Sequence, residues 1–261
     1  MTYTVGCVPY LNAKPLVRQF YEEGPASPVQ VVFDVPSLLP GRLRANHVQA
    51  IMVSSIEALR TPTRVADGVS ISTRADVVSV RLFSRVPIES IESLALDASS
   101  MTSNALAQII LAERYGVRPS LESALPSAQL MLERADACIL IGDNGMRASS
   151  EGLHVLDLGR EWVALTGLPF VWAMWVGGPG LDRTLAEHLR GAARYGMERL
   201  DEVVPWAAAE TGFTEAQCRH YLAEIMDYGL ADDHKAGLAE FGWKLVAHGL
   251  LPAAHTPEFV A

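Results

Sequence analysis

Short runs of apolar, mostly β-branched residues alternate with helix-like segments along the first two thirds of the chain, and this alternation limits the possible folds. In the N-terminal part, strands are expected over residues 4–8, 29–35 and 49–53. Helices are expected between them over 13–21 and 37–45, and again from residue 54. Strands that alternate with helices favour right-handed crossovers and a mainly parallel sheet. The sequence therefore predicts an α/β fold.

The alternation restarts after an expected strand over residues 77–83, which polar residues and Pro87 follow. The apolar run 170–176 then reads as a return strand, and residues 181–248 read as helical with breaks near Pro205, Gly212 and Gly229. Two crossings and a helical return resemble the type II periplasmic-binding-protein architecture, with two lobes of mainly parallel sheet and a cleft between them. We expect residues 1–84 and 170–261 to form lobe one and residues 85–169 to form lobe two. Within lobe two, strands are expected over 93–97, 137–141 and 154–158, and helices over 101–115 and 127–134.

Composition narrows the function classes. The 261 residues include 49% hydrophobic ones, enough for a sizeable core, and carry a net charge of -9 without a Lys/Arg cluster. Nucleic acid and anionic membranes are therefore unexpected partners, and a small anion would have to be bound by local groups. The N-terminus lacks a signal-peptide pattern, and Cys7, Cys138 and Cys218 lack metal-site spacing, so we expect a cytoplasmic protein without a bound metal.

Small polar residues follow four of the predicted strands, at residues 9–15, 54–55, 98–104 and 142–145. Open parallel sheets bind ligands outside the carboxyl ends of their strands, where helix N-termini present unpaired N–H groups. Any one junction is more often a helix cap, because Ser, Thr, Asn and Asp are the preferred capping residues. The run 98–104 has more polar residues than one cap needs. The four junctions, two in each lobe, predict an anion-binding cleft.

The first of these junctions reads Val-Pro-Tyr-Leu-Asn-Ala-Lys-Pro-Leu at residues 8–16. Five further blocks stand at 53–57, 79–87, 93–103, 141–143 and 165–170. Together they resemble, in order, the chorismate dehydratase family of menaquinone biosynthesis by the futalosine pathway, and they span most of residues 5–175. Met101 departs from the family pattern, which has arginine there.

The resemblance implies a hydro-lyase that removes water from chorismate, a dianion, to give 3-[(1-carboxyvinyl)oxy]benzoate without a cofactor. It implies that Asn12 is catalytic and orients the substrate or its departing hydroxyl, and that the substrate's enolpyruvyl carboxylate takes the C3 proton. The residues implied to bind the substrate are Tyr10, Ser54, Ser55, Ser84, Ser100, Thr102, Ser103 and Asp143.

Several alternatives stay open at this point. The 1,4-dihydroxy-6-naphthoate synthases of the same pathway share the fold, although they open with a Pro-Asn-Asp-Thr type of motif that this chain lacks. A small-anion solute-binding protein without catalytic activity is a third possibility, since fold alone does not fix function. Asp143 follows a strand and Gly142, so it suits either a base or a helix cap. The sequence leaves the oligomeric state undetermined.

Overall fold

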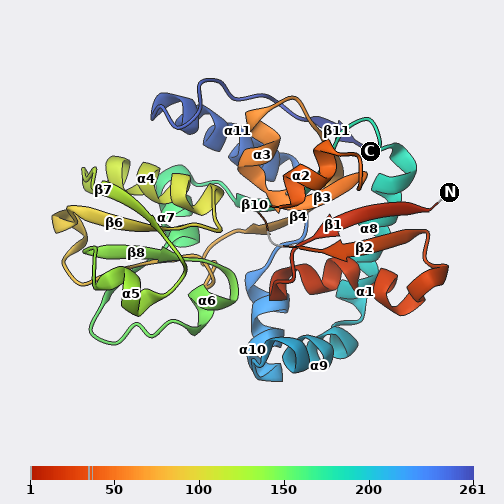
Figure 1. The fold of residues 1–261 in the computed structure, drawn as a ribbon, viewed down its shortest axis with the longest axis horizontal. Helices are drawn as coiled ribbons and strands as arrows, with labels where there is room; N and C mark the ends of the chain where they lie inside the picture. The colour runs from red at the N-terminus through yellow and green to blue at the C-terminus, as the bar shows by residue number, and fades with distance from the viewer. Residues whose placement is uncertain (1, 35, 37) are drawn as a thin grey trace.

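Two β-sheets, each covered by helices, form the two lobes of the protein (Figure 1). The structure is a computed structural model, and it describes residues 2–34, 36 and 38–261. We call the six-stranded sheet with its helices lobe one and the five-stranded sheet with its helices lobe two. The predicted α/β fold with two lobes is confirmed.

The sheet of lobe one has the strand order β11-β4-β10-β3-β1-β2. The strands β1, β2 and β3 run parallel to one another, whereas β10 runs antiparallel to both of its neighbours. Their bounds are β1 (Tyr3–Cys7), β2 (Val29–Phe33), β3 (Ala50–Ser54), β4 (Arg64–Thr73), β10 (Phe170–Gly177) and β11 (Glu258–Val260).

The sheet of lobe two has the order β7-β6-β8-β5-β9. Here β6, β7 and β8 are parallel, and β5 runs antiparallel to β8 and β9. In each lobe, the strand that first follows a crossing between lobes is thus the antiparallel one. The bounds are β5 (Arg81–Ser84), β6 (Ser93–Asp97), β7 (Ser120–Ala124), β8 (Ala137–Leu140) and β9 (His154–Asp157).

The first crossing differs from the expected one. We expected a strand over 77–83 in lobe one and a crossing after it, but β4 ends at Thr73 and β5 already belongs to the sheet of lobe two. The chain therefore crosses within residues 74–80. The strands β4, β7 and β11 were not predicted, and the expected strand 29–35 and helix 37–45 each include one residue, Val35 and Ser37, outside the described part.

Helices cover both faces of the lobe-one sheet (Figure 1). Pro205 lies inside α9 (Leu200–Thr211), although we expected a break in the helix there. A proline has no N–H, so the carbonyl of the residue four positions earlier loses its helical hydrogen bond. That residue, Asp201, is exposed, so water can replace the missing bond. The helix bounds are η1 (Leu11–Ala13), α1 (Lys14–Glu23), η2 (Gly24–Ala26), α2 (Leu39–Arg44), α3 (Ser55–Arg60), η3 (Ile88–Ser90), α4 (Thr102–Tyr115), α5 (Ala128–Leu132), α6 (Gly142–Arg147), α7 (Leu158–Thr166), α8 (Arg183–Glu198), α9 (Leu200–Thr211), α10 (Glu215–His220), the π-helical turn η4 (Tyr221–Ile225) and α11 (Asp232–Ala247).

Helix α11 ties the two lobes together. Its Phe241 ring lies 6.1 Å from the ring of Trp162 in lobe two and 5.0 Å from Phe170 on β10. Lys244 on the same helix donates a 2.6 Å hydrogen bond to Glu113 on α4. Helix α11 therefore packs against both lobes.

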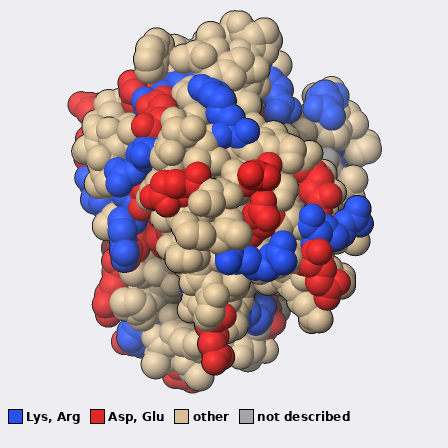
Figure 2. Space-filling view, turned by 90° about the vertical axis from the view of Figure 1, so that its left-hand side faces the viewer, with Lys and Arg blue, Asp and Glu red and all other residues tan. Residues whose placement is uncertain are grey.

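The buried cysteines and the mixed surface charges are typical of a globular protein. All three cysteines are buried, and burial raises the pKa of Cys7 and of Cys138 to about 12. Figure 2 shows acidic and basic side chains interspersed over the lobe-two end of the molecule. Among the described helices, none is both long and apolar enough to cross a membrane.

Candidate functional site

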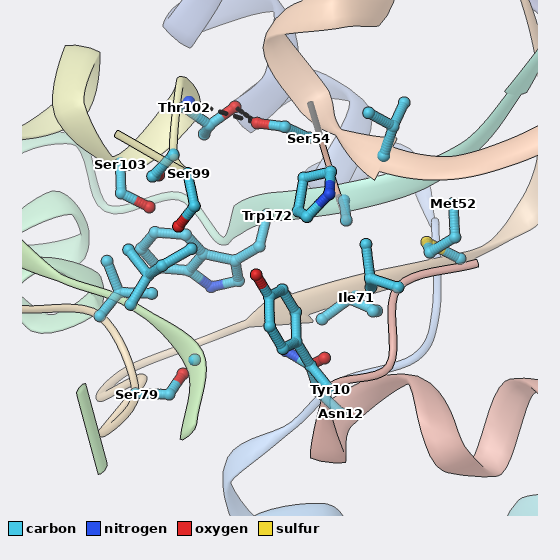
Figure 3. A pocket seen from close by; sticks show the side chains of 18 of the residues that line it. Tyr10, Asn12, Met52, Ser54, Ile71, Ser79, Ser99, Thr102, Ser103 and Trp172 are labelled. Atoms are coloured by element: carbon cyan, nitrogen blue, oxygen red, sulfur yellow. Dashed lines mark hydrogen bonds between the residues drawn. The ribbon is translucent and has the colours of Figure 1, made fainter. Parts of the chain in front are cut away.

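A cavity lies between the lobes, at the carboxyl ends of β1, β3, β6 and β8, and its empty volume, including the part open to solvent, is about 650 Å³ (Figure 3). Parallel strands of an open sheet end at one edge, which is why junctions far apart in the sequence meet here. Five of the eight residues implied to bind the substrate line it, together with Asn12. The lining side chains that carry polar atoms are Tyr10, Asn12, Ser54, Ser79, Ser99, Ser100, Thr102, Ser103 and Trp172.

Two polar groups of Asn12, its side-chain nitrogen and its backbone carbonyl, are bonded within the protein, whereas its side-chain oxygen is not. It lies in η1, directly after the loop that leaves β1. Its Nδ2 donates to the hydroxyl of Tyr221 at 3.4 Å, and its backbone carbonyl accepts from the hydroxyl of Tyr228 at 3.0 Å. Its Oδ1 is buried and has no partner among the described residues. A buried acceptor without a partner is costly, so Oδ1 is the group of this site most in need of a ligand donor.

Tyr10 reaches across from lobe one to lobe two. Its ring lies against Gly142, where an added Cβ would meet ring carbons at 3.6 Å. Figure 3 shows its hydroxyl pointing into the cavity, toward Trp172. Burial raises the pKa of this hydroxyl, and the nearby carboxylate of Asp97 raises it further. Tyr10 therefore remains a hydrogen-bond donor at neutral pH.

Hydroxyl groups from the two lobes bind one another at the opposite wall (Figure 3). Ser54 Oγ donates to Thr102 Oγ1 and accepts from the Thr102 backbone N–H at 3.2 Å. Thr102 Oγ1 also accepts from the Ile56 N–H at 3.1 Å and lies 3.4 Å from Ser55 Oγ. Ser55 is fully buried and is not one of the lining residues. This cluster closes the two lobes against each other at the N-termini of α3 and α4.

The polar run 98–104 forms a tight loop and the first residues of α4. Ser99 Oγ donates to the Asp97 carboxylate at 2.6 Å, and Asn104 Nδ2 donates to the Asp97 carbonyl at 2.9 Å. Ser100 and Ser103 are buried and line the cavity. Because Ser103 lies in the first turn of a 14-residue helix, its hydroxyl is joined by backbone N–H groups and the positive end of the helix dipole.

Ser79 lines the cavity and was not singled out from the sequence. It accepts a 2.7 Å hydrogen bond from the Tyr221 hydroxyl. The residue before it, Val78, has a φ of 62°, an unfavourable conformation for a β-branched residue. The Asp157 carboxylate holds this turn by accepting from the N–H groups of Val77 and Val78 at 2.9 and 2.7 Å. The strained turn aims Ser79 at the cavity.

Ser84, by contrast, lies away from the cavity. Because β5 is antiparallel to β8, its carboxyl end lies beside the start of β8, where Ser84 pairs with Ala137. Its hydroxyl donates to the Val86 carbonyl at 2.7 Å and accepts from the Val86 N–H at 3.1 Å. The hydroxyl of Ser84 is therefore hydrogen-bonded within a turn at the end of the sheet opposite the cavity.

Asp143 also lies outside the lining, in the first turn of α6. Its Oδ1 accepts from the backbone N–H of Leu11 at 3.4 Å, across the boundary between the lobes. Burial raises its pKa, against the opposing effects of this N–H, Arg147 and Lys14. In this position Asp143 orients the loop that carries Tyr10 and Asn12.

Substituting Asp143 by asparagine is expected to raise the melting temperature at pH 7 to 8. A carboxyl group whose pKa is raised on folding stabilises the native state below its unfolded pKa, and this contribution is lost as the pH rises through its folded pKa. Asparagine removes the half-buried charge and keeps an acceptor for Leu11, so the gain should shrink as the pH falls toward about 4. Thermal unfolding across this pH range measures it. The matched change at exposed Asp201 should give no gain, and an Asp143→Asn protein less stable than wild type at pH 8 would contradict the argument.

The cavity is polar but uncharged. No Lys, Arg, His, Asp or Glu is among its described lining residues. Trp172, held by a 3.1 Å hydrogen bond from its Nε1 to Thr73 Oγ1, gives it an aromatic wall beside Ile71 and Met52. Outside the lining, the sulfur of Met101 accepts a hydrogen bond from the guanidinium of Arg60 at 3.7 Å. Such a site can hold an unsaturated ring with oxygen-bearing substituents through neutral donors.

The sequence of the chain is similar to those of known proteins. A family described as "Menaquinone biosynthesis" matches residues 3–245. A protein from Thermus thermophilus named "Chorismate dehydratase" is 30% identical over 92% of this chain and 93% of its own. A Campylobacter jejuni protein of the same name is 28% identical over 64% of each chain.

Solved structures share the fold at lower identity. A protein from Archaeoglobus fulgidus superposes with a TM-score of 0.78 at 17% identity, covering 96% of this chain and 98% of the other. The periplasmic aliphatic sulphonate binding protein of Escherichia coli has a TM-score of 0.67 at 13% identity, covering 96% and 88%. The periplasmic-binding-protein-like architecture expected from the sequence is thereby confirmed.

Proposed function

This chain belongs to the menaquinone biosynthesis family, and we propose that within it the protein is a chorismate dehydratase, a hydro-lyase. Two relatives bear that name, and the first of them aligns with nearly the whole chain. Both the lobe-one junction with Asn12 and the lobe-two junction with Thr102 and Ser103 fall within the aligned family region. The substrate is then the dianion chorismate and the product 3-[(1-carboxyvinyl)oxy]benzoate.

The reaction removes one water from adjacent carbons of the ring. The C3–H bond breaks and its electron pair forms the new ring double bond, while the C4–O bond breaks and its pair leaves with the hydroxyl group. The C3 proton and the hydroxide together make the water. Because the ring becomes aromatic, much of the driving force comes from the substrate, and the protein mainly has to hold one conformer and stabilise developing charge.

The observation that carries the mechanism is the absence of an ionisable base from the described lining, apart from the tyrosine hydroxyl of Tyr10, whose pKa is raised. We propose that the enolpyruvyl carboxylate of the substrate takes the C3 proton. Asp143, the acidic candidate, is turned to the Leu11 N–H outside the cavity. With a base supplied by the substrate, the task of the protein is to hold the ring and the enolpyruvyl carboxylate in the reacting geometry.

The neutral donors then have distinct tasks. We propose that Ser100, Ser103 and the N-terminus of α4 bind a carboxylate, because hydroxyls and helix N-termini suit a buried anion without a cation. Tyr10 donates from the opposite side of the cavity. The Ser54–Thr102 cluster, with Ser55, holds the lobes closed around the ligand and exchanges one of its mutual bonds for a carboxylate oxygen when substrate is present. Asn12 binds the hydroxyl group that leaves.

The purified protein is expected to convert chorismate to a product lighter by one water, with a benzoate-type ultraviolet spectrum. Mass spectrometry and absorbance of the same reaction mixture measure both changes. Chorismate that is bound tightly but recovered unchanged would instead indicate a solute-binding protein. If chorismate is neither bound nor changed, the sister naphthoate synthase activity is the one to assay next.

A further inference from the structure

Tyr221 is hydrogen-bonded to two residues that line the cavity, Asn12 and Ser79, which come from different parts of the chain. It opens the π-helical turn η4, and its side chain is 1% exposed. Its hydroxyl lies 2.7 Å from Ser79 Oγ and 3.4 Å from Asn12 Nδ2, yet it is not one of the lining residues. π-helical turns occur often at functional sites, and here the turn brings a buried phenol behind the cavity wall.

The hydrogen-bond direction follows from the single proton of a phenol. The Tyr221 hydroxyl donates that proton to Ser79 Oγ, so toward Asn12 it can only accept. The Asn12 amide must therefore turn its Nδ2 to Tyr221, which leaves Oδ1 as the buried acceptor without a described partner. Ser79 uses a lone pair for this bond and keeps its own hydroxyl hydrogen for another acceptor.

A hydroxyl group is the ligand that this pair fits. It has one hydrogen to donate to Asn12 Oδ1 and lone pairs to accept from Ser79 O–H, whereas a carboxylate could satisfy only Ser79. On the basis of the proposed function, we propose that Tyr221 is a positioning residue that fixes Asn12 as an acceptor and Ser79 as a donor for the hydroxyl that leaves C4 of the substrate.

Other contacts keep this arrangement in place. Burial raises the pKa of the Tyr221 hydroxyl well above its usual value, so the phenol keeps its proton over the neutral and mildly alkaline range. The backbone of Asn12 is held separately by Tyr228, and that of Ser79 by the turn that Asp157 binds. Tyr221 is therefore needed to orient the two side-chain groups, while other residues hold the two backbones.

Tyr221→Phe is expected to lower kcat with chorismate about 10- to 100-fold and to change KM less than about threefold. The ring and its packing remain in this variant, whereas the hydroxyl that orients Asn12 and Ser79 is lost. Tyr3→Phe is the matched control, since Tyr3 is also buried in lobe one and bonds Asp182 at 3.0 Å far from the cavity. Its kcat should equal that of wild type. Equal losses in both variants would mean a general effect of removing a buried hydroxyl, and would overturn the proposal.

Two further measurements separate positioning from structural damage. The product lacks the C4 hydroxyl, so its Kd by calorimetry should be the same for Tyr221→Phe and wild type within about twofold. In a Ser79→Ala background, Tyr221→Phe should lower kcat by less than about threefold, because its main partner is already gone. The proposal is contradicted if Tyr221→Phe binds the product more weakly than wild type does. It is also contradicted if Tyr221→Phe lowers kcat in the Ser79→Ala background as much as it does in wild type. If wild type converts chorismate and Tyr221→Phe does so equally fast, the inference fails while the proposed function stands.

Discussion

Asn12→Ala is expected to lower kcat with chorismate about 100- to 1,000-fold, the loss seen when one preorganised polar group is removed from a reacting centre. Asn12 Oδ1 is the buried acceptor of the cavity that has no described protein partner, so a substrate hydroxyl is the group it is free to bind. Removing the side chain also frees the Tyr221 hydroxyl from one of its contacts. Steady-state kinetics with chorismate measure the loss.

The control for this substitution is Asn144→Ala, because Asn144 is exposed on α6 and does not line the cavity. That variant should keep the kcat of wild type. The melting temperature of Asn12→Ala should stay near that of wild type, since the substitution removes an unpaired buried group along with one long hydrogen bond. A fully active Asn12→Ala enzyme would falsify the catalytic assignment of Asn12.

Gly145→Ala is expected to lower the free energy of unfolding by about 2 to 4 kcal/mol and to reduce kcat as well. An added Cβ would lie far inside van der Waals contact with the Ser79 carbonyl oxygen, and 2.9 Å from the Leu140 carbonyl oxygen. Both atoms belong to the backbone, so relief requires moving α6 or the turn at residues 77–79. Either movement displaces Ser79 relative to Asn12.

Gly191→Ala is the matched change, because a Cβ at that helical position meets nothing within 4 Å. It should be neutral or stabilise the protein by up to about 1 kcal/mol, since alanine favours helix over glycine. Chemical denaturation measures both stabilities. Gly145→Ala should also lower kcat at temperatures well below its unfolding transition; full activity there would mean that the turn can shift without moving Ser79.

Much of the site could be predicted because it depends on parallel strands. A buried parallel strand can be recognised as a continuous apolar run in the sequence. If all such strands are taken to be parallel, their carboxyl ends must lie on the same side of the sheet. That reasoning brought Asn12, Thr102 and Ser103 to one cavity. The same assumption fails for β5, which is antiparallel: Ser84 at its end lies at the far edge, and Ser79, just before its start, lies in the cavity.

Two other features have no local signal. The strand β4 escaped prediction because its second half contains Ser70 and Ser72, which are fully buried and yet polar. Their hydroxyls bond each other at 2.5 Å, and Ser70 also donates to the carbonyl of Gly229. The position of Tyr221 is equally non-local, because its partner Ser79 lies 142 residues earlier in the chain. Only tertiary structure could show either pairing.

The strand order of lobe one also bears on how the chain can be assembled during synthesis. The strand β10 lies in the middle of that sheet, between β4 and β3, and it is made only after all the strands of lobe two. Until then β3 and β4 lack the strand that joins them and have open edges, which are prone to wrong pairing. Lobe two is continuous in sequence and can be complete on the ribosome first, as domains fold as units during translation. The cavity needs both lobes and the Tyr221 turn, so it is among the last parts of the molecule to exist.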